Sequence, residues 1–88
     1  MTLSLDQLPF RKPATVTGID WSRLSEGDAQ RLRNLGFDEG VRIEALHGAP
    51  FGRDPLAIRV GRMTVAMRRA QARAISVEET PLTEEMGE

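Results

Sequence analysis

The sequence predicts a small, mainly β protein: an antiparallel barrel of about five strands, with one α-helix between the first two strands and a short helical turn before the last. Three observations support this fold class. The 88 residues can form only one hydrophobic core. Short stretches of alternating apolar and polar residues recur along the chain. Only one stretch has the length and the end signals of a stable helix.

The first strand and the helix have local signals. Residues 14–19 are rich in β-branched side chains and predict a strand, in which Gly18 allows a bulge or bend. The preceding residues 3–12 show no clean periodicity, and we expect them to form a short packed lead-in. The helix should begin after Ser25, whose hydroxyl can accept a hydrogen bond from the first turn, and end at Gly36.

Alternating apolar residues predict three more strands, at residues 41–45, 56–60 and 63–67. The Gly61-Arg62 pair between the last two fits a two-residue type II′ turn, because glycine readily adopts the positive φ that its first position requires. Residues 48–55 contain two glycines and two prolines, so they should form a loop.

The last part of the domain is expected to be a short helical connector over residues 68–73 and a strand around Ile75 and Val77 that closes the sheet. Closure would leave no exposed strand edge. We therefore expect one domain over residues 1–79, followed by an acidic, flexible tail over residues 80–88.

The sequence contains no cysteine, which excludes disulfides and thiolate metal sites. Its beginning lacks the basic and apolar regions of a secretory signal, and no apolar run approaches the ~20 residues of a membrane span. We therefore expect a cytoplasmic protein without direct membrane insertion.

Few residues could support catalysis, since the chain has one histidine, one lysine and no tyrosine. Its glycines do not form a phosphate-binding motif. His47 is a weak, adventitious candidate for metal binding, because no other ligands lie at related spacings. We expect no enzymatic activity, no catalytic residues, no cofactor and no dedicated metal site.

Arginines are concentrated over residues 59–73, although the net charge of the chain is −1. No aromatic residue lies in this stretch, so a platform for stacking nucleic-acid bases is missing and nucleic acid is not expected as a partner. Most of these arginines should form a solvated face. Arg68 and Arg69 remain candidates for docking an acidic partner surface.

The loop offers a second candidate for partner binding, at Ala49, Pro50, Phe51 and Gly52. Proline stiffens this segment and places the aromatic ring near its tip. Two interpretations stay open: the ring of Phe51 anchors a partner, or it folds back over the mouth of the barrel.

Several short motifs follow one another along the chain: Thr17-Gly18-Ile19, Arg31 to Phe37, Glu39-Gly40, Ala49 to Gly52, Asp54-Pro55, and Ala66-Met67-Arg68 continuing to Val77. Together they resemble the motifs of the ferrous iron transport protein A (FeoA) family over residues 3–79. Glu39 departs from the family pattern, which usually has proline there, and Arg53 interrupts the usual glycine-aspartate-proline.

The resemblance implies an SH3-like barrel that associates with a membrane ferrous iron transporter carrying a cytoplasmic GTPase domain. It also implies transition-metal binding at the level of the family. The same barrel is similar to the C-terminal domain of iron-dependent and manganese-dependent repressors. The leading hypothesis is an accessory protein that binds and modulates the transporter's G-domain region.

The alternatives are a nucleic-acid-binding small barrel that uses the arginines of residues 59–73, and a metal-responsive module that uses His47. Self-association and the direction of any effect on the partner's GTP hydrolysis are left open.

Overall fold

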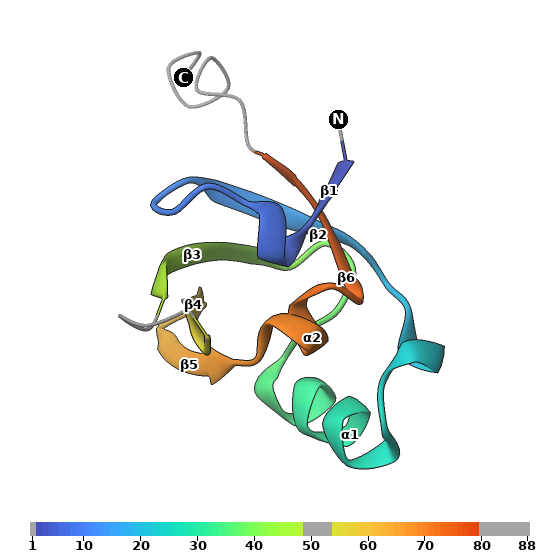
Figure 1. Ribbon diagram of the computed structural model, residues 1–88. Coiled ribbons are helices and arrows are strands. Elements are labelled where there is room, and N and C mark those ends of the chain that lie inside the picture. Colours follow the sequence, from blue (N-terminus) through green and yellow to red (C-terminus); the bar gives the residue numbers. More distant parts are fainter. Residues whose placement is uncertain (1, 49–53, 80–88) are drawn as a thin grey trace.

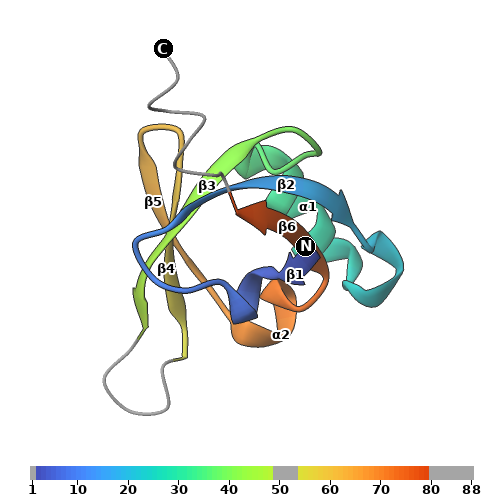
Figure 2. The same ribbon diagram turned by 90° about the horizontal axis from the view of Figure 1, so that it is seen from above.

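The computed structural model describes residues 2–48 and 54–79, and these residues form one antiparallel sheet that coils around a core (Figures 1 and 2). This confirms the predicted fold class. The strands are β1 (Thr2–Ser4), β2 (Pro13–Ile19), β3 (Arg42–Gly48), β4 (Leu56–Val60), β5 (Met63–Met67) and β6 (Ile75–Glu79). The helices are η1 (Leu5–Gln7), η2 (Trp21–Arg23), α1 (Glu26–Leu35) and α2 (Arg69–Ala72).

The strands are hydrogen-bonded in the order β1-β6-β2-β3-β4-β5. The last strand, β6, therefore lies inside the order, paired with both β1 and β2, instead of closing the sheet at its end. Among the described residues the order ends in β1 and β5, so the expectation that closure removes every strand edge is wrong. Helix α2, which follows β5, instead contacts η1, which follows β1.

The N-terminal lead-in is more regular than expected. Thr2–Ser4 forms β1, which pairs with the opposite end of the described chain through Leu3 and Val77. The 3-10 helix η1 follows directly, and its first residue Leu5 is completely buried. The first predicted strand is confirmed, and the register shift between Val16 and Gly18 in its pairing with β6 matches the expected bulge.

Helix α1 has the predicted bounds. The hydroxyl of Ser25 accepts a hydrogen bond from the backbone N–H of Asp28 at 3.1 Å, which satisfies one N–H group of the first turn. At the other end Gly36 adopts a φ of 96°, and the N–H of Phe37 donates to the carbonyl of Leu32.

The β4–β5 hairpin also follows the prediction. Val60 pairs with Met63 across Gly61 and Arg62, and the φ of 60° at Gly61 is the positive value that the turn requires. Strand β3 continues to Gly48, so it is longer than the strand predicted at residues 41–45. It includes Gly48, which was predicted to be the first residue of the loop. Residues 49–53 lie outside the described part of the chain.

The core is entirely apolar within the described residues, which bury no polar or charged side chain. It joins the inner face of the sheet to α1, η1 and α2. Its largest fully buried side chains are Leu5, Val16, Leu32, Phe37, Ile43, Leu56, Ile58, Met67, Ile75 and Val77. In the part of the chain that the structure describes, no helix is long and apolar enough to cross a lipid bilayer.

Candidate partner-binding site

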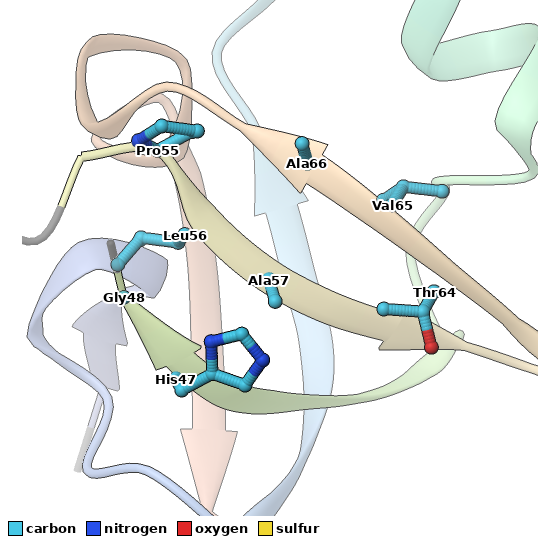
Figure 3. Close-up of a pocket in the computed structure, with 8 residues that line it drawn as sticks. All are labelled: His47, Gly48, Pro55, Leu56, Ala57, Thr64, Val65 and Ala66. Carbon is cyan, nitrogen blue, oxygen red and sulfur yellow. The ribbon is translucent and has the colours of Figure 1, made fainter. Parts of the chain in front are cut away.

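An apolar depression lies on the outer surface of β3, β4 and β5, with a volume of about 390 Å³ (Figure 3). It is open to solvent, and its walls come from the three strands and from Pro55, directly before β4. The residues that line it are His47, Gly48, Pro55, Leu56, Ala57, Thr64, Val65 and Ala66.

The depression exists because outward-facing side chains at its centre are small. In β4, Leu56 and Ile58 point inward and are buried, so the alternation of the strand turns Ala57 outward. Ala57 pairs directly with Ala66 of β5. On its other side Ala57 pairs with His47, next to a register shift that locally distorts β3. Two methyl groups fill much less of this surface than longer side chains would.

His47 lies at the rim of this depression and is exposed. Among the described residues, no three histidine, cysteine, aspartate or glutamate side chains are close enough to hold a metal ion. His47 is thus part of the lining of the depression, and within the described residues it belongs to no group of three such ligands.

The predicted partner-binding residues Ala49, Pro50, Phe51 and Gly52 lie outside the described residues, so their role stays a prediction. Their neighbours are informative, because Gly48 and Pro55 both line the depression.

Arg68 and Arg69, the other predicted partner-binding residues, differ in their surroundings. The side chain of Arg68 is exposed. The side chain of Arg69 is partly buried, and its Nη1 donates a hydrogen bond to the backbone carbonyl of Asp6 at 3.0 Å. The backbone N–H of Arg69 donates to the carboxylate of Asp54 at 3.2 Å, so the end of the loop is attached to α2. The structure thus brings Asp54 into contact with one residue of the arginine pair.

Sequence reasoning did not find the outer face of the hairpin. In the sequence, Ala57, Thr64 and Ala66 are the residues that alternate with the larger apolar residues of two predicted strands. Their small size was visible in the sequence, but the hollow depends on the register that places Ala57 beside both Ala66 and His47. That register involves a distortion of β3 that no local signal predicts.

The fold defines a small SH3-like domain. Residues 3–79 match the FeoA domain family. The chain belongs to this family, as its motifs indicated. A search of curated protein sequences gives no match.

Solved structures agree with this assignment. FeoA from Stenotrophomonas maltophilia, solved in complex with zinc and described as a prokaryotic SH3 domain protein, is 32% identical, with a TM-score of 0.72 and coverage of 89% of each chain. FeoA from Chlorobium tepidum is 29% identical, with a TM-score of 0.79, over 90% of this chain and 71% of that one.

A manganese-dependent transcriptional repressor shares the fold alone. It is 18% identical with a TM-score of 0.77, and the match covers 90% of this chain but 42% of the repressor. The predicted similarity to the barrel of such repressors is therefore confirmed at the level of fold.

Proposed function

We propose that this chain is a cytoplasmic accessory protein of ferrous iron uptake, which binds the cytoplasmic G-domain region of a membrane ferrous iron transporter and modulates its activity. The observation that carries the proposal is the match to the FeoA domain family over residues 3–79. This range contains every residue of the hydrophobic core, so the family assignment applies to the whole folded unit.

The geometry supports a role in binding. Within the described residues the interior holds only apolar side chains, so contacts with a partner must be made by the surface. The outer face of the hairpin offers an apolar depression, and in the sequence Phe51 stands between Gly48 and Pro55, which both line it. Aromatic side chains and apolar hollows often supply much of the binding energy of an interface.

A pull-down with the purified cytoplasmic region of the transporter tests the proposal. The wild-type chain should be retained, and Phe51→Ala should weaken binding about tenfold or more if the ring is an anchor. Arg23→Ala, in the exposed helix η2, is the control and should bind like the wild type. Equal binding by Phe51→Ala would count against the loop, whereas failure of the wild type to bind would contradict the proposed function.

The second part of the proposal concerns modulation. The rate of GTP hydrolysis by the same cytoplasmic region should change when the chain is added to saturation. A rise would identify an activator and a fall an inhibitor of the nucleotide cycle. An unchanged rate at saturating occupancy would show that binding does not act through hydrolysis.

A further inference from the structure

Strand β5 is at one end of the strand order, so one of its edges has no strand beside it among the described residues. The pairing with β4 shows which backbone groups face that edge. Val60 and Met63 flank a two-residue turn and form a hydrogen-bonded pair, and such pairs alternate with non-hydrogen-bonded ones along an antiparallel ladder. The N–H and C=O groups of Thr64 and Ala66 therefore point away from β4.

One contact supports this direction. Nη2 of Arg31, on α1, donates a hydrogen bond to the backbone carbonyl of Ala66 at 3.1 Å. The carbonyl must point outward to be reached from α1. It has a second lone pair, so the contact with Arg31 does not prevent it from accepting another hydrogen bond.

The edge also lacks the usual protection against pairing. Exposed edge strands commonly carry lysine, proline or a bulge, which discourage another strand from adding to them. Met63–Met67 contains no charged residue and no proline, and its register with β4 is uninterrupted. Met63 is the large apolar side chain that is most exposed among the described residues, at 46%.

The apolar depression adjoins this edge. Thr64 and Ala66 provide the outward backbone groups and also line the depression with their side chains. Because side chains alternate along a strand, one set of side chains of an added strand would lie beside the depression, and the other set beside Met63 and Val65. Recognition of an extended peptide in this way combines main-chain hydrogen bonds with pockets for alternate side chains.

Charge indicates what the added strand carries. No acidic residue occurs between Asp54 and Glu78, whereas the same stretch contains five arginines. Arg62 and Arg68 flank β5 at its two ends and both are exposed. A segment with acidic residues on either side of a short uncharged centre would place opposite charges at both ends of the edge.

The same charges disfavour a second copy of this chain as the occupant. A two-fold pairing of β5 with itself that uses both Thr64 and Ala66 places Arg62 of one copy opposite Arg68 of the other, at both ends. Like charges directly opposite each other on neighbouring strands are destabilising.

We infer that the free edge of β5 and the adjoining depression bind an extended, acidic-flanked segment of a partner protein as an added strand. That the segment belongs to the transporter's cytoplasmic region rests on the proposed function. The binding mode itself rests on the edge, the depression and the charges described above.

A defined peptide tests the binding mode without the transporter. The probe is a blocked octapeptide, glutamate-glutamate-valine-threonine-valine-threonine-glutamate-glutamate, added to the ¹⁵N-labelled full chain. Its addition should shift the amide resonances of Thr64, Ala66 and Ala57. Shifts confined to other surfaces, or none at about 1 mM peptide, would overturn the inference.

Two control peptides separate strand addition from general attraction. A peptide methylated on the backbone nitrogens of its four central residues keeps the charges but loses the N–H groups that would pair with β5, and should bind at least about tenfold more weakly. A peptide with lysine in place of every glutamate should lose affinity to a similar extent. Equal affinity of the methylated peptide would exclude strand addition.

A matched pair of variants tests the edge with the transporter's cytoplasmic region. Thr64→Pro removes the outward N–H while keeping the ladder to β4, because proline is tolerated where its nitrogen faces away from the sheet. Thr64→Ala keeps that N–H and loses the same side chain, so it is the reference for Thr64→Pro. Thr64→Pro should bind about tenfold more weakly than Thr64→Ala. Circular dichroism checks that each is folded, and the methylated peptide gives the answer independently if Thr64→Pro is not.

The outcomes separate the two claims. If the wild type binds and Thr64→Pro binds equally well, the inference fails and the proposed function stands. If the wild type does not bind the transporter region, the proposed function fails and the peptide titration still decides the role of the edge. If the wild type is a dimer by analytical ultracentrifugation and Thr64→Pro is a monomer, a second copy occupies the edge and the inference is overturned.

Discussion

At the scale of single residues, Gly61 determines the turn of the β4–β5 hairpin. Its φ is 60°, and a Cβ added there would meet no heavy atom within 4 Å. Gly61→Ala should therefore destabilise the protein through backbone strain alone, by about 1 kcal/mol. Urea unfolding monitored by circular dichroism measures the change in the free energy of unfolding.

Gly27 supplies the matched control for this prediction. It lies in α1, has no positive φ and also has open space around its Cα. Gly27→Ala should stabilise the protein by up to about 0.5–1 kcal/mol, because alanine is the better helix former. Equal effects of the two substitutions would show that the strain at Gly61 is absent.

A second residue-scale prediction concerns the cap of α1. Ser25→Ala removes the hydroxyl that accepts from the N–H of Asp28, and should lower the free energy of unfolding by about 1 kcal/mol. Ser22→Ala is the control, since the hydroxyl of Ser22 donates to the carboxylate of Asp20 on an exposed surface and caps no α-helix. If both variants lost a comparable amount of stability in thermal melts, the result would argue against the cap.

Residue roles that depend on neighbours in sequence could be predicted, and those that depend on distant residues could not. Ser25 and Gly36 were identified because a helix cap is satisfied within a few residues of itself. The hydrogen bond from the side chain of Arg69 to the backbone of Asp6 was not predicted. No local pattern contains that contact, because it depends on how α2 packs against η1.

At the scale of elements, α1 packs against the barrel through a face that includes two buried residues, Ala29 and Leu32. Leu32 is completely buried and belongs to the core. Leu32→Ala should lower the free energy of unfolding by about 2–5 kcal/mol, because it removes buried methyl groups and leaves a cavity. Leu35, only half-buried, provides the control, and Leu35→Ala should cost clearly less in the same urea titration. The reverse order would mean that α1 docks through its last turn.

Elements were predicted well where the apolar pattern was long and poorly where it was short. The hairpin strands β4 and β5 have alternating residues and a glycine turn, and both have the predicted bounds. Strand β1 has only Thr2–Ser4 and depends on β6 for its hydrogen bonds. Three residues carry too little periodicity to indicate a strand. The outer depression was missed for a related reason, since it needs β3, β4 and β5 in a specific register.

At the scale of the whole molecule, the folded unit is predicted to end with β6. The core cluster runs from Leu5 to Val77, and all of it precedes residue 80. A chain ending at Glu79 should therefore have a free energy of unfolding within about 0.5 kcal/mol of the full chain, measured by urea titration. A chain ending at Ser76 loses Val77 and its pairing with Leu3 and Val16, and should be largely unfolded. A large loss of stability in the chain that ends at Glu79 would show that residues 80–88 stabilise the fold.

The fold class was predictable at this scale, but the strand order was not. Alternation and short strands indicate an antiparallel barrel whatever the order of pairing. The observed order depends on β6 inserting between β1 and β2, which joins both ends of the described chain. Such pairings are set by the packing of the complete core. The free edge of β5, on which the inferred binding mode depends, is a consequence of that order.

The pairing of β1 with β6 also places the entry and exit of the domain side by side, with Thr2 opposite Glu78. Neighbouring strands are about 5 Å apart. Because its two ends are neighbours, such a domain can be inserted into a surface turn of a larger polypeptide, or joined to either terminus, without distorting the rest of that polypeptide. In the manganese-dependent repressor, the part that matches this fold makes up 42% of the chain.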